Sequence, residues 1–194
     1  NVDGDVYNTA VGMLAGGAIT SGIKNTIIGG LAGDALTTGD NNIAIGYKAL
    51  STSADGDYNV AIGHSALEDY EGGDGEGHNT AVGSKSQVNA TTGEYNTSLG
   101  SLSMGVGVTT GDGNIALGYQ AGQDLTAGAV NTLIGLYAGS SLTTGSNNIA
   151  IGYNALKLEN THGYNVAIGN NALMNQDAGA HTYNVAIGQG AGEN

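Results

Sequence analysis

The stretch Asn148-Ile149-Ala150-Ile151-Gly152 is one copy of a motif that recurs along the whole chain. The motif is Asn, then Thr, Ile or Val, then a residue that is mostly Ala, then Val, Ile or Leu, then Gly, with Ala or Ser three residues after the Gly. Its copies begin at Asn8, Asn25, Asn42, Asn59, Asn79, Asn96, Asn114, Asn131, Asn148, Asn165 and Asn184. They lie 17 to 20 residues apart, and a motif at a near-fixed period is typical of an array of stacked units. We number these units coils 1 to 11 and count positions from each motif Asn.

The composition favours a thin core that is repeated many times over one thick core. The 194 residues include 36 Gly and no Pro, Cys, Phe or Trp, and the aromatic residues are ten Tyr and four His. Hydrophobic residues still make up 40% of the chain, and Ala, Ile, Leu and Val supply most of them, as in repeat proteins whose units pack only on their neighbours. Glycine-rich disorder would not explain a branched aliphatic residue at position +3 of every copy.

The charge argues against several classes of partner. The net charge is −13, with four Lys and no Arg, so the clustered cations of a nucleic-acid groove are missing. An anionic membrane surface would repel this chain, and no apolar run reaches the length of a transmembrane helix. We therefore expect no nucleic-acid partner, no membrane insertion and no cofactor. The array runs from end to end without an initiating Met, so we expect the sequence to be part of a longer chain.

Within each coil the residue pattern predicts a short strand. Positions +1 and +3 carry Thr, Ile, Val or Leu, and position +2 between them is mostly Ala. An alternation of period two places +1 and +3 on one face of a strand and +2 on the other. We expect +1 and +3 to point inward and the Gly at +4 to end the strand at a bend. A second strand is expected next, with the Ala or Ser at +7 allowing close approach of the backbone.

The second half of the coil comes in two kinds that compensate each other in volume. In one kind, +8 is Gly and +11 is aliphatic, as in Gly139 with Leu142. In the other kind, +8 is Leu and +11 is not aliphatic, as in Leu156 with Glu159. Each coil thus brings about one large aliphatic side chain, which is what a core of constant volume requires. Thr-Thr-Gly segments such as Thr143-Thr144-Gly145 then precede the next Asn and predict a closing turn.

These patterns predict an all-β fold, a parallel β-solenoid of about 11 coils of about 17 residues. Coils stacked about 4.8 Å apart would form a rod roughly 50 Å long, with the motif Asn residues in register as a hydrogen-bonded ladder. Residues 1–194 form a single array, in which coils 1 to 4 match coils 7 to 10 at a distance of 106 residues. An acidic insertion at 68–78 is the longest departure from the period.

The tandem Asn-x-Ala-Ile-Gly-x-x-Ala motifs resemble the head repeats of YadA-like trimeric autotransporter adhesins, and even more closely the arrays of phage tail fibres and tail spikes. The resemblance covers essentially all 194 residues. It implies a parallel homotrimer that serves as a stiff shaft or head on a virion or cell surface. The adhesin head repeat is shorter, near 14 residues, so the shape of its coil does not transfer directly.

The Ala row at +2 is our expected subunit interface in such a trimer, because Ala on an exposed strand face is a poor solvent surface and a good close-packing surface. The row consists of Ala44, Ala61, Ala116, Ala150, Ala167 and Ala186, with equivalents in coils 1 and 5. The alternative is that these residues form a second small core within one subunit.

The acidic insertion is the one candidate metal site. Its carboxylates, Glu68, Asp69, Glu71, Asp74 and Glu76, are separated in part by Gly, and Ca²⁺ takes oxygen ligands from flexible loops. The spacing is not that of an EF-hand, and a solvated loop that bulges from the rod is the favoured interpretation.

Catalytic and ligand-binding signals are weak elsewhere. The four His residues, His64, His78, His162 and His181, have no metal-ligand spacing and are interpreted as surface residues, although a His near a trimer axis would meet two copies of itself. The Ser and Thr residues occupy repeated structural positions, so no catalytic residues are assigned. Tyr47, Tyr119 and Tyr153, all at +5, could stack on sugars.

The sequence therefore predicts a structural or adhesive fibre segment and no enzyme. The segment would be extracellular, a rigid trimeric part of a phage tail fibre or a cell-surface adhesin, with itself and a host-surface glycan or protein receptor as partners. The alternative is a monomeric or filament-forming extracellular solenoid that binds a repetitive ligand such as a glycan or ice. Interruptions of the Thr row at +1, and its expected inward direction, count against ice. A weaker alternative is a polysaccharide-cleaving tail spike.

Overall fold

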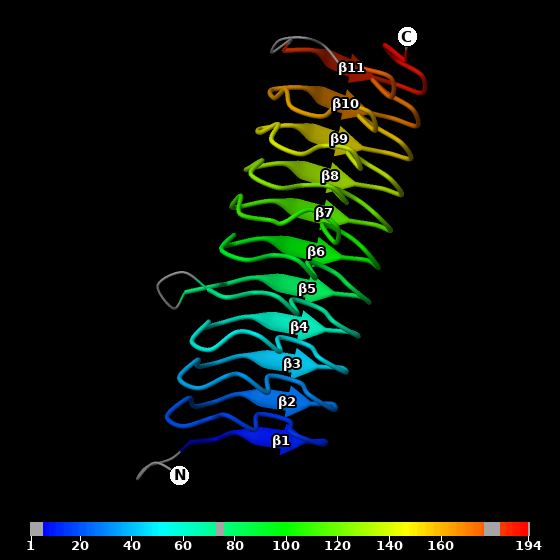
Figure 1. Ribbon diagram of the computed structural model, residues 1–194. Helices are drawn as coiled ribbons and strands as arrows, with labels where there is room; N and C mark the ends of the chain where they lie inside the picture. Colours follow the sequence, from blue (N-terminus) through cyan, green and yellow to red (C-terminus); the bar gives the residue numbers. More distant parts are fainter. Residues whose placement is uncertain (1–5, 73–75, 177–182, 194) are drawn as a thin grey trace.

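A computed structural model describes residues 6–72, 76–176 and 183–193, and these residues form one parallel sheet of eleven short strands (Figure 1). The strands are β1 (Thr9–Val11), β2 (Thr26–Ile28), β3 (Ile43–Ile45), β4 (Val60–Ile62), β5 (Thr80–Val82), β6 (Thr97–Leu99), β7 (Ile115–Leu117), β8 (Thr132–Ile134), β9 (Ile149–Ile151), β10 (Val166–Ile168) and β11 (Val185–Ile187). Each strand pairs with the next one in sequence, from β1 at one end to β11 at the other. The predicted all-β parallel solenoid is confirmed.

Neighbouring coils pair like position with like position. Ile149 of β9 lies opposite Val166 of β10, and Ala150 lies opposite Ala167. The same register holds along the whole sheet, including across the acidic insertion, where Ala61 lies opposite Ala81. Extra residues are therefore absorbed in the turns, and each motif position forms a column parallel to the rod axis.

The Gly at +4 ends each strand for two physical reasons, as Gly135 illustrates. Its φ is +133°, a conformation that L side chains rarely adopt. A Cβ added there would also lie 2.5 Å from the carbonyl oxygen of Gly152 in the next coil, closer than packed atoms allow. Gly at +4 is thus required by conformation in every coil and by space in coils 1 to 10.

The expected second strand is wrong for the described residues, which contain no strand beyond the eleven. Positions +6 and +8 of every coil have positive φ, as at Asn154 (54°) and Leu156 (52°). An extended strand cannot contain left-handed residues at alternate positions. These residues instead turn their N–H groups along the rod axis, where Asn154 bonds back to Leu136 O and Leu156 forward to Ala172 O.

The core lies inside the coil and is lined by positions +2, +7, +8 and +11. Our expectation for the strand faces is therefore reversed: +2 points inward, and +1 and +3 point outward. Ala44, Ala61, Ala116, Ala150 and Ala167 have no exposed surface, and Ala186 keeps 9%. The Ala row is thus the wrong assignment for a subunit interface, because the chain already buries it in its own core.

The predicted compensation of volume is confirmed, and the structure adds a third contributor at +2. Leu50, Leu67 and Leu156 at +8 are fully buried, as are Leu36, Leu125 and Leu142 at +11 of the Gly coils. Where two successive coils both have Gly at +8, the second coil carries a large residue at +2. Leu133 is such a residue, since Cβ atoms added at Gly122 or Gly139 would lie 2.7 and 2.8 Å from its methyl groups. Ile27 fills the same space between coils 1 and 2.

A polar layer divides the core into two apolar clusters. One cluster runs from Ile27 to Ala90 and the other from Met104 to Ala186. Between them, the buried side chains of Ser86, Gln87 and Ser98 hydrogen-bond one another, with Gln87 Nε2 2.8 Å from Ser98 Oγ. The array is therefore continuous in its backbone but not uniform in its interior.

Candidate functional site

The predicted Asn ladder runs through all eleven coils and is confirmed. Asn131 is typical: its Oδ1 accepts the backbone N–H of Asn148 at 2.9 Å, and its Nδ2 donates to Gly145 O at 2.9 Å. Equivalent bonds from each Asn N–H to the preceding Asn Oδ1 link Asn8 through to Asn184, at 2.8 to 3.2 Å. The position requires an acceptor and a donor on one short side chain, which Asn provides.

The ladder changes where a coil has extra residues. In coil 4, Asn59 Nδ2 is buried and has no hydrogen-bond partner among the described residues. The carbonyl at the usual place belongs to Glu76, and it accepts the hydroxyl of Tyr70 instead, at 3.1 Å. The insertion therefore removes one hydrogen bond of the ladder, the one that the Nδ2 of the motif Asn donates to the closing turn in most other coils.

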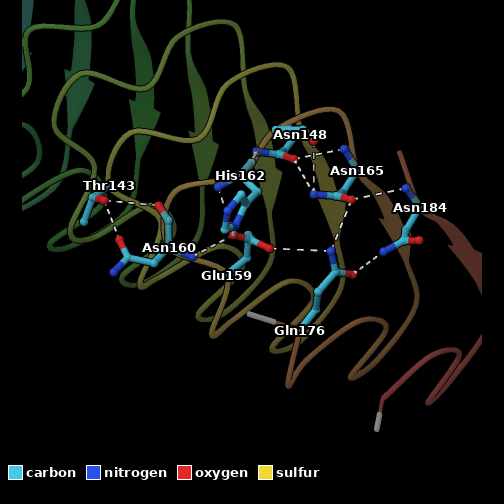
Figure 2. A network of polar contacts seen from close by, with 9 residues as sticks. Thr143, Asn148, Glu159, Asn160, His162, Asn165, Gln176 and Asn184 are labelled. Atoms are coloured by element: carbon cyan, nitrogen blue, oxygen red, sulfur yellow. Dashed lines mark hydrogen bonds and ion pairs between the residues drawn. The ribbon is translucent and has the colours of Figure 1, made fainter. Parts of the chain in front are cut away.

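Coil 9, of 17 residues, and coil 10, of 19, share the polar network of Figure 2. Glu159 is fully buried, and its Oε1 accepts the backbone N–H of His162 at 2.9 Å, with His162 Nδ1 also 2.9 Å away. Gln176 of the next coil joins the ladder, since its Nε2 lies 3.3 Å from Asn165 Oδ1 and its Oε1 accepts Asn184 Nδ2 at 2.9 Å. Polar or aromatic residues at +11, namely Ser53, Tyr70, Glu159 and Gln176, thus form hydrogen bonds with turn or ladder groups.

Two further columns of side chains bond from coil to coil at the closing turns. Thr37 and Thr126 at +12 donate their hydroxyls to the carbonyls of Ala54 and Thr143 at 2.9 and 3.0 Å. Asp57 accepts the backbone N–H of Asp40 at 2.6 Å. The chain bends at three of the four Thr-Thr-Gly segments, at 37–38, 91–92 and 143–144, and the first Thr of two of them, Thr37 and Thr143, also bonds to the next coil.

The outward strand face is the feature of the surface that most needs an explanation. The +1 and +3 columns present Thr, Val, Ile and Leu along the full height of the sheet, and Leu99 (53%) and Ile115 (40%) are strongly exposed. A continuous apolar surface of this length is uncommon on a monomeric soluble protein and marks an interaction site. We call it the outward face.

Aromatic columns flank the outward face on both sides. At −1, His78 lies between the rings of Tyr58 and Tyr95, with centroid distances of 4.8 and 5.3 Å. At +5 and +6, Tyr119, Tyr137 and Tyr153 form edge-to-face contacts. Because neighbouring rings pack on each other, these columns extend the apolar surface beyond the strands.

The acidic insertion does not bring its described carboxylates together. Glu68 forms an ion pair with Lys48 at 2.8 Å, and Glu76 lies toward His78 and Tyr95. Glu71 is exposed, and Asp74 lies outside the described residues. No group of three or more potential metal ligands occurs in the part of the chain that is described.

The described histidines have structural surroundings. His64 stacks on Tyr47 with a centroid distance of 5.6 Å, His78 belongs to the −1 column, and His162 belongs to the turn network. His181 lies outside the described residues. His64 and His78 are exposed, as interpreted, whereas His162 is half-buried in its turn.

No pocket was found in the described part of the chain. Across residues 6–72, 76–176 and 183–193, no helix is long and apolar enough to cross a bilayer. Comparison with protein-family models, with curated proteins and with solved structures found no match to this chain. The function is therefore argued from the outward face and the ladder.

Proposed function

We propose that this chain is a rigid segment of an extracellular fibre, a homotrimeric shaft or head of a phage tail fibre or cell-surface adhesin. The observation that carries the proposal is the outward face. Its +3 column is Val, Ile or Leu in every coil, and its +1 column is Thr, Ile or Val. The opposite side of the coil presents mainly polar and small residues, such as Asp34, Ser51 and Thr52. A partner would cover the first side and leave the second in water.

The partner that fits this face is a further copy of the same chain, in parallel. The face is built from columns with one spacing, set by the sheet, and a parallel copy repeats that spacing at every coil. Three such faces turned toward a common axis would enclose the β-branched side chains in a prism with no exposed apolar strip. Closed cyclic symmetry of this kind is the common solution for homo-oligomers.

The mechanical role follows from the bonding along the rod. Each coil is tied to the next by backbone bonds and by the Asn ladder, and Thr side chains at +12 add further bonds from coils 1, 2, 7 and 8. Bending or stretching would therefore break many bonds together. Such a rod can hold a receptor-binding part away from a particle. The acidic surface, with a net charge of −13, would keep neighbouring fibres apart.

The mass of the purified chain in solution tests the proposal. We expect light scattering after size exclusion to give about 57 kDa, three times the 19.1 kDa of one chain. The control is a variant with charges on the outward face, Ile115→Glu with Ile149→Glu, which should give 19.1 kDa without loss of the far-UV spectrum. A wild-type chain that remains monomeric at high concentration would overturn the trimer.

One observation favours the alternative, a monomer that binds a repetitive ligand. The Thr residues at +1, including Thr26, Thr97 and Thr132, lie on the outward face, contrary to expectation. This removes one argument against ice, although Ile43 and Ile115 still interrupt the row. A monomeric chain that shapes or slows growing ice crystals, or that is retained on a glycan matrix, would favour this alternative.

A further inference from the structure

The aromatic rings that flank the outward face alternate between its two sides. Rings occupy +5 in coils 3 and 4 (Tyr47, His64), then −1 in coils 4 to 6 (Tyr58, His78, Tyr95), so that these two runs overlap in coil 4. They then occupy +5 or +6 in coils 7 to 9 (Tyr119, Tyr137, Tyr153) and −1 again in coils 10 and 11 (Tyr164, Tyr183). Where one run ends, the next begins on the other side.

Within a single coil the two flanks are therefore complementary in size. Coil 6 has Tyr95 at −1 and Ser101 at +5, whereas coil 9 has Asn147 at −1 and Tyr153 at +5. Eight of the eleven coils carry one ring at these two positions together, namely Tyr7/Met13, Asn41/Tyr47, His78/Ser84, Tyr95/Ser101, Gly113/Tyr119, Asn147/Tyr153, Tyr164/Asn170 and Tyr183/Gln189. Coil 4 carries two rings, Tyr58 and His64, and coil 2 carries none. In coil 8, with Val130 and Leu136, the ring is at +6, on Tyr137.

Contacts within one chain explain the runs but not the alternation. Rings in neighbouring coils stack on each other, which favours continuing a run on the same flank. The two flanks of one coil lie on opposite sides of the strand, six residues apart, roughly 15 Å or more for a largely extended segment. The side chains at −1 and +5 therefore cannot fill each other's space in the same chain.

We propose that the −1 flank of one protomer packs against the +5 flank of the next protomer at the same coil height. This inference rests on the proposed parallel trimer and specifies its contact surface. In a parallel cyclic assembly, one flank of each chain meets the other flank of its neighbour, in register. The complementary sizes then place about one ring in each layer of each boundary, as constant packing volume requires. An antiparallel pair would bring different coils together and leave the complementarity unexplained.

Cysteine cross-linking tests the contact, because the chain has no Cys of its own. We expect the double variant Tyr95→Cys with Ser101→Cys to form covalent trimers on oxidation or with a short bis-maleimide. Each single variant should form none, since −1 meets +5 and not itself. The matched control is Tyr95→Cys with Gln189→Cys, whose positions lie five coils apart, about 24 Å along the axis, and it should not link. Covalent dimers from either single variant, or no product from the double variant, would overturn the inference.

A volume swap in coil 9 gives a second readout. Asn147→Tyr should crowd the boundary, and Tyr153→Asn should leave a gap, so each lowers the thermal midpoint of the trimer. Combining them returns one ring to the boundary and should recover more than half of the summed loss. Residues that do not touch within a chain give additive effects, so additive losses would refute the contact between protomers.

The two proposals fail in different ways. A wild-type chain of 19.1 kDa removes both the fibre trimer and its flank contact. A wild-type trimer that does not cross-link at coil 6, and whose coil 9 losses add, keeps the trimer and removes the flank contact alone.

Discussion

The side-chain amide of each ladder Asn uses its oxygen to accept a hydrogen bond and its nitrogen to donate one. Asn131 is 1% exposed, and its Nδ2 lies 2.9 Å from Gly145 O and 3.0 Å from Asn114 Oδ1. Asp would keep the acceptor that Asn148 needs and would place a carboxylate against two oxygens. Asn is therefore required at this position, because the groups that it contacts need both an acceptor and a donor.

We predict that Asn131→Asp lowers the free energy of unfolding by about 3 kcal/mol or more, because it leaves a buried charge without a partner. Denaturant unfolding would measure this loss. The matched control is Asn175→Asp at an exposed position, with an expected change within about 0.5 kcal/mol. Equal losses in the two variants would show that the ladder amide does not matter to stability.

Many residues other than Gly have a left-handed backbone conformation. Every coil has positive φ at −1, +6 and +8, including Val130 (58°), a β-branched residue. Such conformations cost roughly 1–2 kcal/mol per residue. They are held because the N–H groups they direct along the axis bond to neighbouring coils, as Val130 N does to Asp112 O at 2.9 Å.

At the scale of the coil, the two core types are alternative solutions for the same interior. Leu133 at +2 fills the space that Gly122 and Gly139 leave open. Coils 9 and 10 have Ala at +2, and Leu156 and Leu173 at +8 fill that space from the opposite wall. Since +8 has positive φ in both types, one type can be converted into the other without changing the backbone.

We therefore predict that Leu133→Ala costs about 2–5 kcal/mol by opening a cavity, and that Gly139→Leu alone destabilises the chain by a clash with Leu133. The double variant should be more stable than either single variant, because the new Leu occupies the cavity. Thermal unfolding of all three variants provides the measurement. Losses that simply add would refute the shared space.

At the scale of the whole molecule, the excess of carboxylates affects stability through a few partly buried groups. Burial raises the pKa of Asp124. Burial, with the charge of Glu68 adding to it, raises the pKa of Asp69. Burial and the charges of neighbouring acids also raise the pKa of Asp57, although the hydrogen bond that it accepts from the backbone of Asp40 acts in the opposite direction.

Glu68 shifts in the opposite direction. Partial burial favours its neutral form, but hydrogen bonds from Lys48 and Ser65 and the charge of Lys48 outweigh it and lower its pKa. Its stabilising contribution is present above its ordinary pKa of 4.5 and is lost as the pH falls below that value.

We predict that the midpoint temperature of thermal unfolding rises as the pH is lowered from neutral toward 3.8, the ordinary pKa of an Asp side chain. An acid with a raised folded pKa binds its proton more readily when folded, so the free energy of unfolding rises as the pH falls through that pKa. Asp124→Asn should reduce the rise, and Glu68→Gln should leave the rise in place. The measurement is a series of melting curves at one protein concentration, and a midpoint that falls steadily from pH 7 would contradict the prediction.

Local spacing along the chain was enough to predict the repeat, the strand at +1 to +3, the Gly bend at +4, the Asn ladder and the compensation between +8 and +11. These features follow from local spacing and from stacking like on like, so each copy of the motif repeats the same information. Even the insertion at 68–78 leaves the register of Ala61 and Ala81 unchanged.

Which face of the strand lies inside the coil could not be predicted from spacing, because it depends on how the complete coil packs. A period of two defines two faces and does not rank them, and hydrophobicity alone favoured the β-branched face. The interior is narrow, and a Leu at +8 fills the space opposite +2, so only a small residue fits at +2 of those coils. Ile27 and Leu133 break the Ala row where two successive coils have Gly at +8, a signal in the sequence that could have revealed the inner face. Chain packing thus placed the Ala row in the core and left the larger side chains of +1 and +3 on the surface.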